Sequence, residues 1–229
     1  MSGVNRKYVI PGEVVASGDL TLDANVVKIG DSVYSTRIGM AEISHNSVRV
    51  IPLCGPYAPR EDDIVVGKVL SNSAMSWEVD INSFFPGVLP GSNVFGRDFS
   101  PDQHSLIDKF SRGDMIKTKV LAFDRTRDPM LTMTGPGLGK IQEGETVKIS
   151  PTKVPRLIGK KGAMIRMIEV GSKTRLIIGQ NGVIVLNGLD ECIQKAKRAI
   201  SLVEEEAHTA DLTPRVQDLL GISQEDESN

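Results

Sequence analysis

The chain has 229 residues, of which 40% are hydrophobic, and its formal net charge at pH 7 is −2. This length accommodates two or three small domains. No apolar stretch approaches the length of a membrane span, and no signal core follows the first residues, so we expect a soluble cytoplasmic protein with no membrane contact. Cys54 and Cys192 stand far apart and the three histidines are scattered. We therefore expect no metal and no cofactor, and both cysteines as reduced thiols in the core.

The charge is distributed unevenly along the chain. Residues 140–200 contain 12 Lys and Arg against 5 Asp and Glu, whereas residues 201–229 contain 1 against 8. A basic module followed by an acidic tail is typical of a protein that meets phosphate in one place only.

Residues 1–60 are rich in β-forming residues and punctuated by turns. Strand-like runs cover 9–15, 26–35 and 47–53. The segment is too short for an independent enzyme fold, so we expect a small amino-terminal β domain that packs on a neighbour. Residues 56–60, with two prolines, are expected to form a rigid linker.

Residues 61–134 contain about five expected strands, with the longest insertion between the third and the fourth. This pattern favours an OB-fold barrel. The opening Gly67-Lys68-Val69, the alternating run from Gly113 to Asp124 and the closing Leu131-Thr132-Met133 resemble the S-one domain, an RNA-binding variant of that barrel.

Residues 140–206 follow a different order of elements. A strand at 146–150 precedes short helices at 154–158 and 163–170, the second closed by Gly171. Two strands joined across Asn181-Gly182 come next. A long amphipathic helix follows, with an apolar stripe from Leu189 to Val203 that includes Cys192. The order β-α-α-β-β-α is that of a KH domain, so the fold class is multidomain, β and α+β. Residues 207–229 are expected to form an acidic tail with one helix near 213–220.

The motif Gly159-Lys160-Lys161-Gly162 joins the two short helices. Glycines let a backbone approach a ligand closely, and the lysines add positive charge beside free amides. The G-x-x-G loop of KH domains clamps the backbone of about four nucleotides. The alternative is a solvated helix–helix turn in an unrelated α+β module, but the surrounding elements favour RNA binding. The candidate RNA-binding residues are Gly159, Lys160, Lys161, Gly162, Arg156, Ile158, Ile165 and Arg166.

An apolar floor for the bases is expected beside this loop. It would come from Ile158, Ile165, Ile168 and the strand position Ile177 or Ile178. The alternative for each isoleucine is an ordinary place in the core.

The order of a β-rich segment, an S-one barrel and a KH domain resembles the S-one/KH cap subunit of the archaeal RNA exosome. The resemblance is carried by Val9-Ile10-Pro11-Gly12-Glu13, by Pro56-Tyr57-Ala58-Pro59 and by Leu138-Gly139-Lys140. It implies a non-catalytic subunit that sits as a three-fold cap on a ring of RNase-PH-like subunits. It further implies that the cap captures single-stranded RNA for 3′-to-5′ degradation and that the amino-terminal domain docks on the ring.

The sequence departs from the S-one pattern at the residues that stack on bases. The two aromatic positions and the histidine position of that pattern fall at Met75, Glu78 and Pro90. We therefore expect the barrel to act by shape and charge, and we expect Trp77, Phe84 and Phe85 in its core. The candidate phosphate contacts are Lys68, Arg97, Lys117, Lys119, Arg125 and Arg127.

Two other functions are weighed against this one. A fragment of polynucleotide phosphorylase would place KH before S-one, and the sequence has no nucleophile–base pair, so we expect no enzyme. A transcription elongation or translation-associated RNA-binding factor remains the alternative, although the transcription factor of this kind usually has two KH copies and only one is found here.

Overall fold

The computed structural model describes residues 5–96, 98–101, 105–124, 126–207 and 211–221. It divides into two compact units, Met1–Gly55 and Pro56–Asn229. The second unit contains the barrel and the KH domain. No helix of the described part of the chain is long and apolar enough to cross a membrane.

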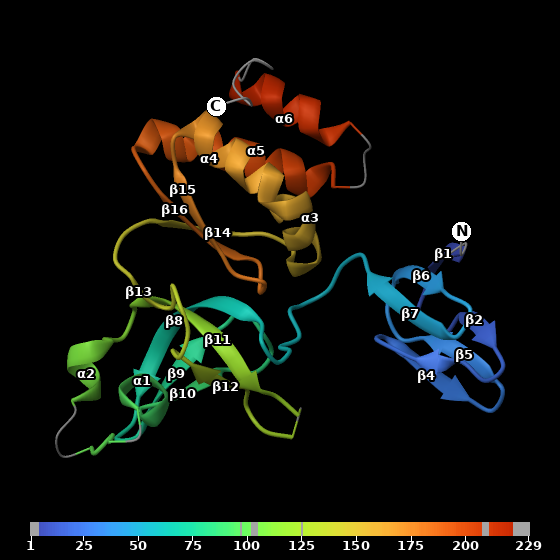
Figure 1. The fold of residues 1–229 in the computed structure, drawn as a ribbon, viewed down its shortest axis with the longest axis horizontal. Helices are drawn as coiled ribbons and strands as arrows, with labels where there is room; N and C mark the ends of the chain where they lie inside the picture. Colours follow the sequence, from blue (N-terminus) through green and yellow to red (C-terminus); the bar gives the residue numbers. More distant parts are fainter. Residues whose placement is uncertain (1–4, 97, 102–104, 125, 208–210, 222–229) are drawn as a thin grey trace. The chain divides into compact units, whose positions relative to one another are not determined.

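The amino-terminal unit consists of two small sheets (Figure 1). The four-stranded sheet has the order β1 (Asn5–Val9), β6 (Gly39–Ile43), β7 (Ser47–Pro52) and β3 (Thr21–Leu22). The three-stranded sheet has the order β2 (Val14–Ser17), β5 (Ser32–Ser35) and β4 (Val26–Ile29). Their shared core is small and aliphatic, and its buried members are Val9, Val15, Val33, Ala41, Val48 and Val50.

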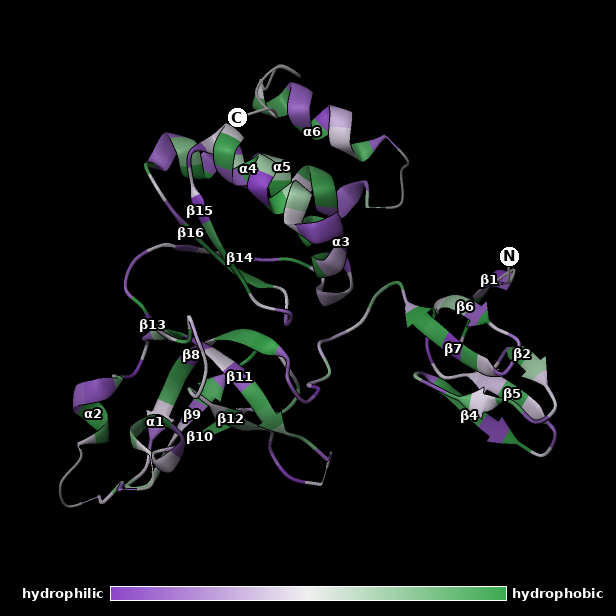
Figure 2. Ribbon diagram, viewed as in Figure 1, coloured by the Kyte–Doolittle hydropathy of each residue, from purple (hydrophilic) through white to green (hydrophobic). Residues whose placement is uncertain are grey.

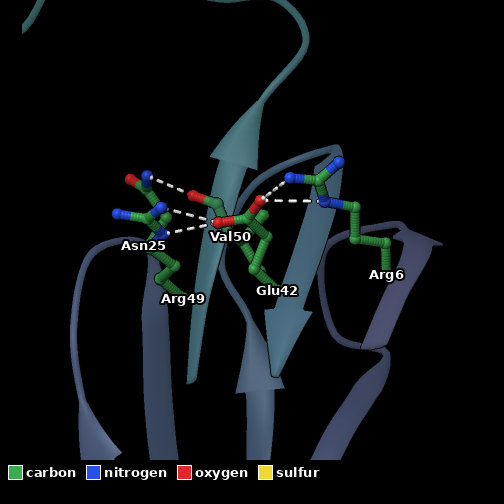
Figure 3. A network of polar contacts seen from close by, with 5 residues as sticks. All are labelled: Arg6, Asn25, Glu42, Arg49 and Val50. Atoms are coloured by element: carbon green, nitrogen blue, oxygen red, sulfur yellow. Dashed lines mark hydrogen bonds and ion pairs between the residues drawn. The ribbon is translucent and has the colours of Figure 1, made fainter. Parts of the chain in front are cut away.

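A charged triad crosses three strands of the larger sheet. Glu42 on β6 lies opposite Arg6 on β1 and Arg49 on β7. Its carboxylate accepts hydrogen bonds from Arg6 Nε at 3.0 Å and from Arg49 Nη2 at 2.6 Å. Figure 3 shows the carboxylate between the two guanidinium groups, with Asn25 donating to the carbonyl of Val50 nearby. The hydrogen bond from Arg49, followed by that from Arg6, holds the pKa of Glu42 below its usual range.

The barrel is built from six strands in the order β12-β10-β9-β8-β11-β13, and β12 also pairs with β11, which closes five of them. Two short helices, α1 (Ser92–Phe95) and α2 (Leu106–Lys109), lie in the insertion after the third strand. The strands are β8 (Ile64–Asn72), β9 (Ser76–Asp80), β10 (Gly87–Pro90), β11 (Met115–Ala122), β12 (Met130–Thr132) and β13 (Gly139–Ile141). This confirms the expected OB-type barrel.

Trp77 forms the centre of the barrel core. It is fully buried and contacts the ring of Phe110, with 5.1 Å between the ring centroids. Its indole N–H donates to the carbonyl of Phe110 at 3.1 Å, so the one polar atom of the side chain is satisfied inside the core.

The KH domain has an antiparallel sheet in the order β14 (Glu145–Lys148), β16 (Val183–Asn187) and β15 (Arg175–Ile178). Helices cover one face of this sheet (Figure 1). They are η1 (Pro151–Lys153), α3 (Val154–Ile158), η2 (Lys160–Gly162), α4 (Ala163–Ser172), α5 (Asp190–Glu205) and α6 (Leu212–Leu220). Figure 2 shows hydrophobic and hydrophilic residues alternating along α4 and α5, as expected for helices with one buried face.

Helix α6 extends the KH core. Leu212, Val216 and Leu220 are buried against the same cluster as Ile200 and Val203 of α5. Lys195 of α5 donates through Nζ to the carbonyl of Leu220 at 2.7 Å and so satisfies the carboxyl end of α6. The expected helix near 213–220 is confirmed, and it packs on the domain instead of lying in a solvated tail.

Three local expectations were wrong. Gly171 lies inside α4, which ends at Ser172 and is capped by Lys173 in a left-handed conformation with φ 55°. Leu189 precedes α5 and is 77% exposed, so the buried stripe begins at Ile193. Cys54 is exposed after the last strand of its unit, while Cys192 is half-buried.

Candidate nucleic-acid interface

The G-x-x-G loop connects α3 to α4 through three residues with positive φ. Gly159, Lys161 and Gly162 have φ of 72°, 54° and 78°. A Cβ on Gly159 would lie 2.8 Å from Cβ of Met164 and 2.9 Å from its backbone nitrogen, so only glycine fits the start of the loop. Lys161 has no such freedom, so its left-handed conformation is strained and has to be held by the residues around it.

The two lysines of the loop project into solvent. Lys160 and Lys161 are both exposed, and among the described residues neither side chain forms an ion pair or a hydrogen bond. Arg156 is exposed on the preceding helix. Uncompensated ammonium groups beside a glycine-rich turn are suited to binding a phosphate backbone.

Arg166, a candidate RNA-binding residue, contacts the loop directly. Its Nε donates to the carbonyl of Gly162 at 3.2 Å and its Nη2 to the carbonyl of Lys161 at 2.5 Å. The guanidinium of α4 therefore binds the loop itself and fixes the orientation of its last two peptide groups.

The structure separates the candidate isoleucines into three environments. Ile158, Ile165 and Ile178 are partly buried against the KH core. Ile168 is fully buried, so it is a core residue. Ile177, one residue from Ile178 on β15, points to the opposite face of the sheet and packs with Val66 of the barrel. Of the two strand candidates, only Ile178 shares a face with Ile158 and Ile165.

The candidate lysines of the barrel lie on its first and fourth strands. Lys68 is paired with Met115, and Lys117 with Val66, so both side chains share the face on which the KH domain packs. Lys119 forms an ion pair with Asp62 at 2.6 Å. Arg127 is exposed in the loop between β11 and β12, whereas Arg97 and Arg125 lie outside the described residues.

OB-folds bind oligonucleotides on the outer face of their second and third strands, here β9 and β10. The side chains on this face make it poorly suited to a polyanion. Glu78 lies at its centre, opposite Val88, and accepts a hydrogen bond from Ser71 Oγ at 2.8 Å. Met75 is 60% exposed beside it. A carboxylate and aliphatic groups stand where S-one domains stack bases on aromatic rings.

The expectation that three aromatic residues fill the barrel core was only partly right. Trp77 is buried, but Phe84 is 79% exposed and Phe85 is 37% exposed. Phe84 and Phe85 lie in a bend of the loop between β9 and β10, where Phe85 packs on Phe123 and Phe84 stays in solvent.

The β15–β16 turn attaches the KH domain to the barrel. Asn181 is fully buried, and its Nδ2 donates to the carbonyls of Val66 at 2.7 Å and Ile81 at 2.8 Å. Its Oδ1 accepts from the N–H of Val66 at 3.2 Å. Gln180 exchanges two hydrogen bonds with the backbone of Ile64. The sequence identified this turn only as a hairpin and missed its role between domains.

Outside the loop, the described residues form a cavity but no cluster placed to hold a metal. A cavity of about 260 Å³ between barrel and KH domain is lined by residues of both, among them the ion pair of Asp114 with Lys140. Within the described residues, no group of three or more His, Cys, Asp or Glu side chains is placed to hold a metal.

A small β domain, an OB-type barrel and a KH domain with a complete G-x-x-G loop, in this order, define an RNA-binding protein of the S-one/KH class. Two family models match the chain. The model of the exosome RNA binding protein RRP4 N-terminal domain matches residues 6–54, and the KH domain model matches residues 144–202.

Whole-chain comparisons agree with these domains. The exosome complex component Rrp4 of Nitrosopumilus maritimus is 50% identical over 94% of this chain and 96% of its own length. The component of the same name from Thermofilum pendens is 41% identical over 94% and 93%. A crystal structure described as an exosome complex RNA-binding protein superposes with a TM-score of 0.67, at 40% identity, over 73% of this chain and 96% of its own. The chain belongs to the Rrp4 family of exosome components.

Proposed function

We propose that this chain is a non-catalytic subunit that caps a ring of RNase-PH-like subunits in three copies and feeds it single-stranded RNA for 3′-to-5′ degradation. The observation that carries the proposal is the G-x-x-G loop, where glycines shape the backbone and two exposed lysines form no ion pair with any described residue. Membership of the Rrp4 family supplies the exosome context.

RNA capture is assigned to the KH domain. Lys160 and Lys161 neutralise phosphates, while the half-buried Ile158, Ile165 and Ile178 form an apolar floor for bases. Contacts of this kind bind the backbone and the base faces, so they tolerate many sequences. Such tolerance suits a subunit that passes diverse RNAs to a nuclease.

Docking on the ring is assigned to the amino-terminal unit. Several of its large apolar side chains stay exposed, including Tyr8 at 70%, Ile29 at 65% and Ile10 at 60%. Exposed apolar side chains of this size on a small unit are compatible with a protein–protein contact. The barrel and KH domain then remain available to RNA.

The test is reconstitution with RNase-PH-like ring subunits and single-stranded RNA. The wild-type chain is expected to co-elute with the ring and to speed RNA decay. Lys160→Glu/Lys161→Glu is expected to co-elute normally but to lose most of the acceleration of RNA decay. The new carboxylates repel the RNA phosphates that the lysines attract. Lys109→Glu/Arg112→Glu is the matched control, since it makes the same change of charge at exposed positions of the barrel.

Each alternative has its own outcome. Failure to co-elute, with RNA binding retained, would refute the cap role and favour a polymerase or ribosome partner. RNA degradation by the isolated chain, abolished by a point mutation in it, would refute the non-catalytic assignment.

A further inference from the structure

The loop between β9 and β10 holds one aromatic ring in solvent. Phe84 is 79% exposed, the most exposed aromatic side chain among the described residues. A phenylalanine in this position lacks the hydrophobic stabilisation that burial normally provides, and so exposed a phenylalanine on a structured loop is uncommon.

One side of this loop is anchored to the KH domain. Asn82 Nδ2 donates to the carbonyl of Asn181 at 2.9 Å, and its Oδ1 accepts from Nζ of Lys148 at 3.2 Å. Its own N–H donates to Asp80 Oδ1 at 2.8 Å, which holds Asn82 at a φ of 55°. The segment that precedes Phe84 is therefore fixed by contacts with two domains.

The other side of the loop is anchored to the barrel. Ser83 forms a backbone bridge with Tyr57, a buried residue whose hydroxyl donates to Asp63 Oδ2 at 2.7 Å. Phe85 packs on Phe123 with 5.4 Å between ring centroids. With both flanking residues held, Phe84 is presented to solvent by a pre-organised backbone, so a ligand would not have to order the loop.

Among the described residues from Pro56 onward, the other aromatic rings are buried or partly buried, apart from Phe85. Trp77 and Phe110 are buried, and the S-one stacking positions are Met75, Glu78 and Pro90. Phe84 and the partly packed Phe85 are the exposed aromatic side chains of these described residues. The exposed Lys148 places an ammonium group beside the same loop, at the contact with Asn82. An aromatic face next to a cation is the arrangement that proteins use for single strands.

We propose that Phe84 is a base-stacking platform for single-stranded RNA at the junction of barrel and KH domain, with Lys148 as its phosphate contact. This rests on the proposed function and adds a second RNA subsite to the G-x-x-G loop. RNA is favoured over a protein partner because Lys148, whose Nζ donates to Asn82, supplies a cation near an exposed aromatic ring, and single strands are bound by such pairs of an aromatic face and a cation.

The first experiment is a fluorescence titration of full-length Phe84→Trp with oligoadenylate. The chain has one native tryptophan, Trp77, which is fully buried and gives a constant background measured in the wild type. Stacking on a base is expected to quench the new indole. An unquenched signal at saturating RNA would refute the platform.

The second experiment compares affinities for the same RNA. Phe84→Ala and Phe84→Leu are both expected to bind about 5- to 20-fold more weakly, because leucine keeps the apolar surface but has no face for stacking. Phe84→Tyr should bind as wild type. Leu189→Ala is the matched control, since Leu189 is 77% exposed at the far end of the KH sheet, and it should have no effect.

The outcomes separate the two proposals. If Lys160→Glu/Lys161→Glu loses RNA while Phe84→Ala binds as wild type, the platform is wrong and the proposed function stands. If the wild-type chain binds no RNA, both are wrong. If Phe84→Ala keeps its RNA affinity but no longer co-elutes with the ring subunits, the residue is a protein contact instead.

Discussion

At the scale of single residues, the G-x-x-G loop depends on an arginine outside the motif. Three residues with positive φ lie within four positions, one of them a lysine, and such a backbone persists only where its surroundings hold it. Arg166 provides that support by donating to two successive carbonyls of the loop. We infer that Arg166 is a positioning residue and that its charge is secondary.

This role predicts that Arg166→Lys will bind RNA nearly as poorly as Arg166→Ala, about 3- to 10-fold below wild type. Lysine keeps the charge, but it cannot donate in the fixed fork of a guanidinium. Affinity should be measured over a range of salt concentrations, together with hydrogen exchange of the loop amides. Faster exchange with an unchanged salt slope supports positioning. Wild-type affinity in Arg166→Lys would instead show that only the charge matters.

The sequence predicted that Gly159, Lys160, Lys161 and Gly162 form a loop between two helices, because the signals for such a loop are local. A turn that needs positive φ selects glycine, and the flanking helices show in the spacing of apolar residues. Arg166 and Ile178 were named as candidates, but their partners depend on how α4 and β15 fold back. Phe84 was placed wrongly because the burial of a loop aromatic is decided by tertiary contacts, and here its neighbour Phe85 takes the inner position.

At the scale of elements, the amino-terminal unit has short strands and a small core, and ion pairs between its strands add to the stability of the sheet. Its longest predicted runs divide into separate strands, because Gly12 and Gly30 adopt φ of 85° and 63° and turn the chain. The order of hydrophobic residues predicted β structure but not this division. The triad of Arg6, Glu42 and Arg49 ties β1, β6 and β7 together at the side-chain level.

The triad predicts an acid-sensitive amino-terminal unit. The pKa of Glu42 is lowered in the folded state, so its stabilising contribution is complete above the unfolded pKa of about 4.3 and is lost as pH falls through the lower folded value. Glu42→Gln should therefore lower the urea midpoint at neutral pH, and the difference from wild type should vanish in acid. The methyl signals of the buried Val33 and Val48 report on this unit.

Glu13→Gln is the control for this experiment. Glu13 is paired with Lys7 in the same unit and its pKa is also lowered, but its side chain is 33% exposed. Solvent screens an exposed pair, so the substitution should change the midpoint much less. Equal effects of both substitutions would contradict a special role for the triad.

At the scale of the whole molecule, the barrel and the KH domain are joined by polar contacts between residues that lie 99 to 115 positions apart in the sequence. Asn181 reaches Val66 and Ile81, and Asn82 reaches back to Asn181. The sequence predicted both domains and their order. The Asn-Gly dipeptide is typical of a hairpin turn, so no local pattern indicated that Asn181 also contacts the barrel. Because the Phe84 loop shares these contacts, the junction also supports the proposed stacking platform.

The junction predicts that barrel and KH domain unfold together and that Asn181 couples them. Asn181→Ala leaves the N–H of Val66 and the carbonyls of Val66 and Ile81 without their partner, at a cost of about 2–4 kcal/mol. Trp77 fluorescence reports on the barrel, and far-UV circular dichroism reports mainly on the KH helices. The two transitions should coincide in the wild type and separate in Asn181→Ala.

Asn187→Ala is the control, because Asn187 is exposed and makes one 3.4 Å hydrogen bond to the carbonyl of Glu143. Coincident transitions in Asn181→Ala, at a stability equal to that of the control, would mean that the apolar contact of Val66 with Val183 and Val185 couples the domains alone.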